Sequence, residues 1–245
     1  ISTFGTTDYS TSRKLQEKYP GFKWSETDAV SELKKIFKLP VWFENTARSA
    51  AQGNYINRYI KEHNNIAYVV VGEGIGLGII IDGRIVRTGN RNIYGIGHMV
   101  VDSNGTKCRC GKYGCIETKV SPSALVSQVM SELDMGKQSI LSKKQDSLSY
   151  HDVCRAAEKG DKLASYVIEN AALNFAIGLE NILNILNLDL IVIGGELPEN
   201  SKLFCEVVKN KLDNITPGFS IAVETNQTET ALRGSASAFV LQLLE

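Results

Sequence analysis

One short stretch of the chain carries a histidine and three cysteines, and it restricts the fold more than any other feature of the sequence. The four residues are His98, Cys108, Cys110 and Cys115. Zinc favours four tetrahedral ligands, and one histidine with three cysteines is a common structural set. Because four protein ligands close such a site to water, the metal should hold structure and should not activate water. The stretch therefore predicts a structural Zn2+ site formed by these four side chains.

The residues around the candidate ligands suit this role. Glycines that permit tight turns lie among them, at Gly105, Gly111 and Gly114. Basic side chains, which favour the thiolate form that binds metal, lie at Lys107, Arg109 and Lys112. The alternative is a set of free thiols with His98 an ordinary core histidine, which the density of cysteines makes the weaker interpretation.

The composition is that of a globular protein of one or two domains. The chain has 245 residues, of which 43% are hydrophobic and 22% are charged. Lys plus Arg and Asp plus Glu both number 27, so there is no global electrostatic reason to bind nucleic acid or an anionic membrane. No apolar run approaches the length of a membrane span, and no secretion signal is recognised, although the sequence begins with Ile1 rather than Met. Five cysteines with three in a cluster do not resemble a disulfide framework, so a cytoplasmic location is expected.

Hydrophobic periodicity predicts strands that alternate with helices, which is typical of an α/β architecture. The predicted strands are 39–43, 66–71, 188–193 and 221–224. The predicted helices begin after a cap at Ser25, cover 46–61, begin again at Ser121, and cover 161–186, 202–212 and 230–244. Asp82-Gly83 between two β-branched runs predicts a tight hairpin turn. Residues 1–24 are expected to be irregular, and the polar residues 134–149 a connector.

The glycine-rich segment 72–78 follows a predicted strand and leaves two interpretations open. Its backbone amides suit a phosphate, or the segment is simply a tight turn between strands. It lacks the Gly-Lys-Ser/Thr ending of a Walker loop, and a strand rather than a helix follows it, unlike a dinucleotide-binding loop. Glu73 within the segment would repel a phosphate. Gly194-Gly195, after another buried strand, is equally ambiguous by itself.

The segment Gly95-Ile96-Gly97-His98-Met99, followed by the cysteine cluster and Glu117, resembles the signature of the ROK family (repressors, open reading frames, kinases). Further segments are similar to the family's strand before its catalytic dipeptide, its second phosphate loop, its adenosine-side loop and its closing helix, at 39–45, 72–83, 191–195 and 231–238. The resemblance implies the actin-like, ribonuclease-H-like α/β fold, in which two lobes flank a cleft. It places the remainder of an N-terminal lobe, incomplete in this chain, in residues 1–66 and a zinc-containing C-terminal lobe in residues 67–245.

The resemblance also implies that phosphoryl transfer is lost. ROK kinases transfer a phosphoryl group from ATP to a sugar hydroxyl with an Asn-Asp pair, and here Asn45 is followed by Thr46. A threonine hydroxyl is too weak a base at neutral pH, so a rate contribution of typically ~10²–10⁴-fold disappears. Gly95 stands at the family's sugar-binding Glu, Glu73 stands at the Thr of its Gly-Thr-Gly loop, and its Asp-x-Gly-Gly-Thr loop is absent. We therefore expect no catalytic residues and no kinase activity.

The sugar side of the family pattern is better preserved. Asn45, His98 and Glu117 match family positions that hydrogen-bond sugar hydroxyls, and amide, imidazole and carboxylate groups suit polyol recognition. For Asn45 the alternative role is a helix cap. For Glu117 the alternative is a solvated surface acid.

A chain that lacks the catalytic residue but keeps the zinc motif and the sugar-binding positions is typical of the family's transcriptional repressors. We therefore expect the effector-binding and oligomerising part of a sugar-responsive regulator, a repressor of sugar-utilisation genes that forms a homodimer or homotetramer. The effector would be a sugar or sugar phosphate, DNA would bind only through a separate N-terminal winged-helix domain absent from this chain, and no membrane partner is expected. One alternative is a ROK kinase that phosphorylates a hexose with ATP and uses Glu44 as its base. The other is a regulator that senses a protein.

Overall fold

The computed structural model describes residues 2–3, 7–8, 13–14, 29–41, 44–87, 95–214 and 218–244. These residues form two compact units. The first unit takes its described residues from 1–68, 77–93 and 226–245, and the second from 69–76 and 94–225. Each unit is described by itself, and the division into lobes at residues 66 and 67 stays a prediction.

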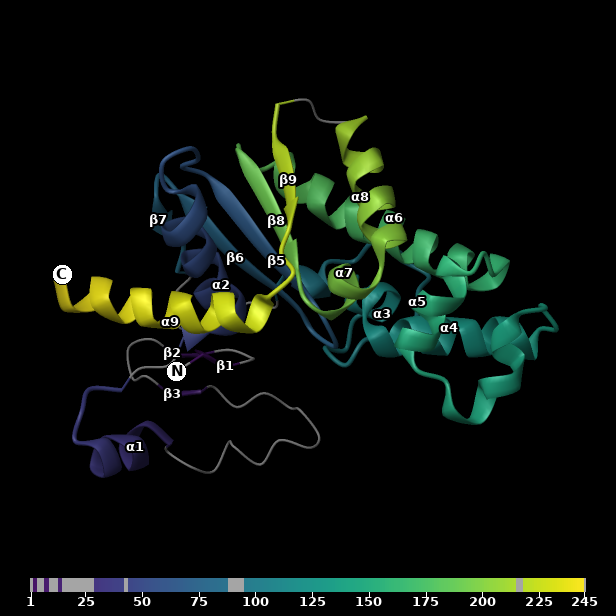
Figure 1. Ribbon diagram of the computed structural model, residues 1–245, viewed down its shortest axis with the longest axis horizontal. Coiled ribbons are helices and arrows are strands. Elements are labelled where there is room, and N and C mark those ends of the chain that lie inside the picture. The colour runs from purple at the N-terminus through teal and green to yellow at the C-terminus, as the bar shows by residue number, and fades with distance from the viewer. Residues whose placement is uncertain are drawn as a thin grey trace. The chain divides into compact units, whose positions relative to one another are not determined.

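A sheet of five strands runs through the chain (Figure 1). Its strands are β5 (Ile66–Val71), β6 (Ile75–Ile81), β7 (Arg84–Ile85), β8 (Leu190–Gly194) and β9 (Ser220–Val223), in the order β7-β6-β5-β8-β9. β8 and β9 are parallel, and β6 and β7 are antiparallel. Every residue of β5 and β8 is buried, as expected of continuous β-branched runs in a central strand.

The hairpin between β6 and β7 confirms the turn predicted at Asp82-Gly83. Ile80 pairs with Ile85 and Ile81 with Arg84, which leaves a two-residue loop. Asp82 has a φ of 49° and Gly83 a φ of 74°. Two successive positive φ values define the turn whose twist matches that of a hairpin, and Asp-Gly is a favoured pair for it.

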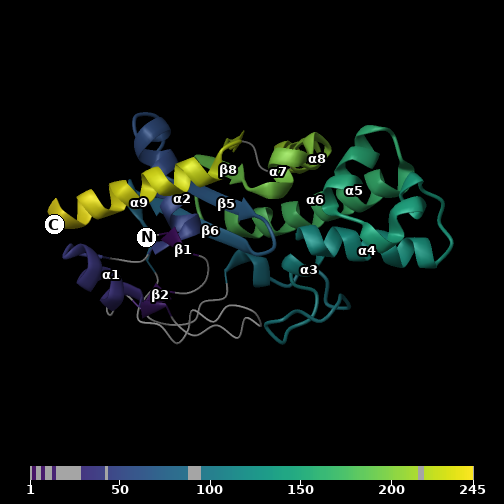
Figure 2. The ribbon, with the colours of Figure 1, turned by 60° about the horizontal axis from the view of Figure 1, so that its bottom comes forward.

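The first unit holds two close helices and several short strands. Its elements are β1 (Ser2–Thr3), β2 (Thr7–Asp8), β3 (Arg13–Lys14), α1 (Ala29–Phe37), β4 (Glu44–Asn45), α2 (Thr46–Asn54), a π-helical turn (Tyr55–Tyr59) and α9 (Gln227–Leu244). α2 and α9 lie side by side in Figures 1 and 2. A Cβ at Gly234 would overlap the carbonyl oxygen of Ser49, so the absence of a side chain there permits this close approach.

Two predictions for this part of the chain are wrong. β1 pairs in parallel with β4, and β2 pairs with β3, so the described residues before position 24 form short strands instead of an irregular segment. The strand predicted at 39–43 is displaced: residues 39–41 are irregular, the observed strand is Glu44–Asn45, and Trp42 and Phe43 lie outside the described residues. The cap predicted at Ser25 also lies outside them.

The second unit is mostly helical around the long helix α6. Its helices are α3 (Glu117–Val120), α4 (Pro122–Asp134), α5 (Tyr150–Glu158), α6 (Lys162–Leu183), α7 (Glu196–Asn200) and α8 (Lys202–Asp213), with 3-10 turns at Ile96–His98 and Ile140–Ser147. α6 packs against α3, α4, α5 and α8 (Figure 2). Ser121 caps α4, with Pro122 in its first turn, which confirms the helix start predicted there.

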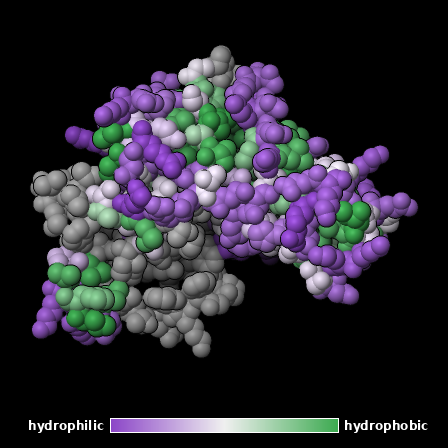
Figure 3. Space-filling model, viewed as in Figure 1, coloured by the Kyte–Doolittle hydropathy of each residue, from purple (hydrophilic) through white to green (hydrophobic). Residues whose placement is uncertain are grey.

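The described residues include no helix that is both long and apolar enough to cross a membrane. In agreement with this, hydrophilic side chains cover much of the face that α4, α5 and α6 present in Figure 3.

Candidate metal centre and the adjoining pocket

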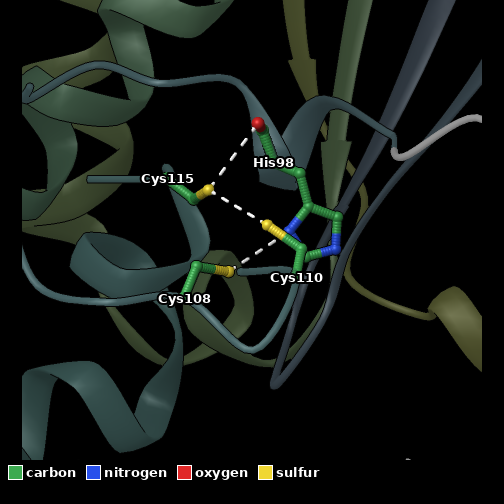
Figure 4. Close-up of side chains that lie close together, drawn as sticks. All are labelled: His98, Cys108, Cys110 and Cys115. Atoms are coloured by element: carbon green, nitrogen blue, oxygen red, sulfur yellow. Dashed lines mark hydrogen bonds between the residues drawn. The ribbon is translucent and has the colours of Figure 1, made fainter. Parts of the chain in front are cut away.

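The structure brings the four predicted metal ligands together in the second unit. The ligand atoms of His98, Cys108, Cys110 and Cys115 all lie within 4.8 Å of one another, and the side chains point toward a common centre (Figure 4). Cys110 Sγ and Cys115 Sγ are 3.6 Å apart, and Cys108 Sγ and His98 Nδ1 are 3.4 Å apart. A tetrahedral zinc with Zn–S bonds of ~2.3 Å places neighbouring sulfurs roughly 3.8 Å apart. The donor set and its spacing therefore fit a tetrahedral ion.

Backbone hydrogen bonds build this arrangement before any metal is considered. Cys108 N donates to Lys112 O and Gly111 N donates to Cys108 O, which forms a tight turn that aims Cys108 and Cys110 at the same point. Gly111 has a φ of 92°, which favours glycine. Ile116 N donates to Met99 O, which holds Cys115 beside the 3-10 turn that carries His98.

Burial affects the thiol pKa values more than the nearby positive charges do. Burial raises the pKa of Cys108, and it raises the pKa of Cys115 to about 12. At Cys110 burial also acts to raise the pKa, but hydrogen bonds from the backbone of Lys112 and from the neighbouring cysteines outweigh it and lower the pKa. The expected preference for thiolate is thus met only at Cys110. A metal would have to displace protons from the other two thiols as it binds.

Glu117, predicted to contact sugar, is buried and has hydrogen-bond or ion-pair partners on both carboxylate oxygens. Arg109 Nε lies 2.7 Å from Glu117 Oε1, and Arg109 Nη2 donates to Glu117 Oε2 at 2.8 Å. Ile75 N also donates to Oε2, at 3.4 Å. The side chain of Glu117 is 9% exposed. The alternative role of a solvated surface acid is therefore wrong.

A pocket of about 490 Å³ opens beside the metal cluster within the second unit. Charged groups in its lining come from Glu73, Arg109 and Glu117. Hydroxyl and amide groups come from the loop before the cysteines and from α3 and α4, at Thr106, Thr118, Ser121, Ser123, Ser127, Gln128 and Ser131. Because pockets for small polar ligands use a few placed polar groups to fix orientation, this lining suits a polyol.

The carboxylate of Glu73 occupies the N-terminus of α4, where an anion could otherwise bind. Its Oε1 accepts from Ser123 N at 3.1 Å, and its Oε2 accepts from Ser123 Oγ at 2.7 Å. The backbone amides at a helix N-terminus attract negative charge. The carboxylate of Glu73 thus takes the place that a free phosphate oxygen would need at this helix.

The comparison with known proteins fits these observations. The sequence profile described as "ROK family" matches residues 4–239.

The chain belongs to the ROK family.

Among known ROK proteins, the chain is similar to the xylose repressor of Bacillus subtilis (strain 168), with 30% identity over 195 residues that make up 80% of this chain and 48% of the repressor. It thus spans about half the length of this curated relative. It also matches the crystal structure of a ROK family transcriptional regulator, a homologue of the E. coli MLC protein, with a TM-score of 0.83, 25% identity, and coverage of 96% of this chain and 61% of that one.

A ROK family glucokinase from Streptomyces griseus, solved in complex with glucose and AMPPNP, matches with a TM-score of 0.75 and 24% identity over 89% of this chain and 74% of that chain. At this identity the likeness shows the fold alone. With both structures as neighbours, the predicted α/β, actin-like and ribonuclease-H-like ROK fold is confirmed.

Asn45 and Thr46, which the sequence resemblance places at the ROK catalytic dipeptide, lie in the first unit at the start of α2. Asn45 Oδ1 accepts from Ala47 N at 2.9 Å and from Arg48 N at 3.3 Å, so Asn45 does cap the helix, as its alternative role predicted. Thr46 follows as the first residue of α2, and its hydroxyl lies 3.2 Å from the Ser2 hydroxyl. A sugar contact of Asn45 stays a prediction, since the capping oxygen is only one part of its amide.

Glu44, the substitute base considered for a ROK kinase, is buried in the first unit between two arginines. Its Oε1 accepts from Arg48 Nε at 2.9 Å and from Asn45 N at 2.8 Å, and its Oε2 lies 3.6 Å from Arg87 Nε. Burial raises the pKa of this carboxyl, and burial together with Arg87 lowers the pKa of Arg48 to about 10. Both oxygens are thus engaged in an ion-pair cluster, which suits a structural role better than proton transfer.

Sequence reasoning missed two pairings that involve predicted residues. Arg109 is the pair of Glu117, and Ser123 is the pair of Glu73. Neither pairing stands out in the sequence, because the contacts depend on turns whose geometry only the fold supplies. The position of Arg109 between two candidate ligands was the one available signal.

Proposed function

We propose that this chain is the sugar-sensing and oligomerising body of a ROK transcriptional regulator, a repressor of sugar-utilisation genes without kinase activity. The similarity to the xylose repressor supports a regulator. As the resemblance to the family's repressors implies, DNA binding is assigned to a separate N-terminal winged-helix domain. A cytoplasmic location and a homodimer or homotetramer belong to the same proposal.

The observation that carries this proposal is a contrast between two sets of residues. On the phosphoryl-transfer side, Thr46 lies at the position that the family resemblance assigns to the base, and the carboxylate of Glu73 bonds to Ser123 at the start of α4. On the sugar side, Glu117 is buried, ionically paired and at the wall of a polar pocket next to the metal cluster. A site that keeps its polyol-binding groups and replaces its base suits sensing.

Zn2+ is the ion we propose for the four-residue cluster. Four protein ligands, three of them thiols, at tetrahedral spacing are typical of structural zinc. When bound, the ion would cross-link the 3-10 turn that carries His98 to the cysteine loop. It would thereby hold Glu117, two residues after Cys115, beside the pocket.

Binding of a sugar would then change the position of the attached DNA-binding domains. As the family resemblance implies, we propose that His98, Glu117 and Asn45 contact the sugar, and that binding selects one of two conformations of the protein. A ligand shifts such an equilibrium only by its difference in affinity for the two states. The sugar must therefore bind the selected conformation more tightly.

A melting-temperature scan tests the proposal. The chain is heated with D-xylose, D-glucose or N-acetyl-D-glucosamine, each with and without magnesium-ATP. A ligand that binds only the folded state must raise the melting temperature. We expect a rise with one sugar and none with ATP. A rise with ATP would favour the kinase, and no rise with any sugar would favour a regulator that senses a protein.

A further inference from the structure

Arg109 lies between two of the candidate metal ligands, yet its side chain belongs to the pocket. Cys108 and Cys110 flank it in the sequence, and the pocket lining includes Arg109 beside Glu117. The side chain of Arg109 is 37% exposed, whereas that of Glu117 is 9% exposed. The guanidinium therefore connects the metal loop to a carboxylate that is almost completely enclosed.

The ion pair has the two-pronged geometry that arginine forms with carboxylates. The two nitrogens Nε and Nη2 lie 2.7 and 2.8 Å from the two oxygens of Glu117. Such a fork fixes the orientation of both groups, which a lysine cannot do. Ile75 N supplies a further hydrogen bond to Oε2.

The surroundings leave little room for the carboxylate to turn. A Cβ at Gly97 would stand 3.4 Å from Glu117 Oε2, and a Cβ at Gly74 would stand 3.7 Å from the same oxygen and 3.4 Å from Arg109 Nη2. Backbone thus closes around the ion pair on two sides. The fork from Arg109, the hydrogen bond from Ile75 N and the adjacent backbone together fix the orientation of Glu117 toward the pocket.

The charge of the pocket follows from the same pair. Arg109 is the single cationic residue in the described lining, and its charge is matched by Glu117. Glu73 adds a second carboxylate, bound to Ser123. A phosphate entering this pocket would meet an excess of negative charge and would have to compete with Glu117 for the guanidinium.

We propose that Arg109 determines which effector the pocket accepts: it holds Glu117 as a fixed acceptor for sugar hydroxyls and neutralises it, so that the site takes an uncharged sugar and rejects a phosphorylated one. This inference rests on the proposed sugar-sensing function and adds the ligand class to it. Arg109 acts as a positioning residue, because its effect reaches the sugar through Glu117.

Calorimetric titration tests it on the zinc-loaded chain. The probes are D-glucose and N-acetyl-D-glucosamine beside their 6-phosphates, and D-xylose beside its 5-phosphate. For the sugar that binds, we expect its phosphate to bind at least about tenfold more weakly. Arg109→Met should lower the affinity for the uncharged sugar by roughly 10–100-fold, because the buried carboxylate of Glu117 loses its charged partner. Zinc content and the circular dichroism spectrum should remain those of the wild type.

Two controls separate positioning from general destabilisation. Arg109→Lys keeps the charge but not the fork, so it should recover only part of the affinity. Arg155→Met removes an exposed arginine that pairs with Asp152 on α5, outside the pocket lining, and should leave sugar affinity unchanged. If Arg109→Met does not fold, two results still test the inference. They are the preference of the wild type between each sugar and its phosphate, and the sugar affinity of Arg109→Lys.

The titrations distinguish a failure of the inference about Arg109 from a failure of the proposed sugar-sensing function. If the wild type binds none of the sugars or their phosphates, the sugar-sensing function itself fails. If a sugar phosphate binds more tightly than its parent sugar, or if Arg109→Met binds sugar like the wild type, the function stands and the inference about Arg109 is overturned.

Discussion

A methyl group added at Gly114 should damage the metal loop far more than one added at Gly111. Both glycines lie in the cysteine loop with positive φ, 65° at Gly114 and 92° at Gly111. A Cβ at Gly114 would overlap the carbonyl oxygen of Asp102 and lie 2.5 Å from its carbonyl carbon. A Cβ at Gly111 would meet no atom within 4 Å. Gly111→Ala is therefore a matched control for backbone strain without a clash.

The difference can be estimated from the contacts that must break. Left-handed backbone costs a residue with a side chain roughly 1–2 kcal/mol, and both variants incur this cost. To relieve the clash, Gly114→Ala must also loosen the hydrogen bonds from Val101 N to Gly114 O and from Gly114 N to Thr106 O, each 2.9 Å long. At roughly 1 kcal/mol for each bond, the total for Gly114→Ala is about 3–4 kcal/mol.

Thermal unfolding followed by circular dichroism measures the effect. For a chain of this size each kcal/mol corresponds to roughly 2–4 °C, so Gly114→Ala should melt roughly 10 °C lower and Gly111→Ala no more than roughly 8 °C lower. Metal analysis of the same samples should find reduced zinc only in Gly114→Ala. Equal melting temperatures and equal zinc in the two variants would refute the reasoning, since it depends on the clash with Asp102.

Three further perturbations have expected outcomes. Cys110→Ser should lower bound zinc from about one ion per chain to near none in elemental analysis, and undiminished zinc would mean that the ion is held elsewhere. Glu73→Gln should lower the melting temperature slightly and make it respond to inorganic phosphate, because the carboxylate that bonds to Ser123 at the start of α4 loses its charge; an unchanged response to phosphate would contradict this role. The ion pair with Lys144 lowers the pKa of Asp152, so its stabilisation is fully present above the unfolded-state value near ~3.9 and is lost as the pH falls through the folded-state value. Urea unfolding should therefore find Asp152→Asn less stable than the wild type at neutral pH, with the gap closing below roughly pH 4, and a gap that widened on acidification would show the sign to be wrong.

Sequence reasoning succeeded where local rules decide the structure. Asp82-Gly83 specifies its turn through two positive φ values, and the four β-branched residues in Ile66–Val71 favour a buried strand. The metal cluster was also predictable, because ligand type and spacing carry the information and the loop glycines permit the turns.

It failed where the deciding contact is distant in the sequence. The strand at Glu44–Asn45 forms because it pairs with Ser2–Thr3, a partner that no local pattern announces. α5 was missed because its start depends on a capping box of Ser149 and Asp152, and Ser149 is the last residue of the polar stretch that was interpreted as a connector. Glu73 was expected to repel phosphate, but its bond to Ser123 fifty residues away in the sequence was not foreseeable.

Isothermal titration calorimetry tests the central claim, a sugar sensor without phosphoryl transfer, in a single measurement. Sugar is injected into the zinc-loaded chain, first alone and then in the presence of magnesium-ATP. We predict a saturable heat with one sugar and a baseline that returns to its starting level after each injection in both runs. A sustained heat flow with magnesium-ATP would show turnover and identify a kinase, and the absence of binding heat with every sugar would contradict the sensor.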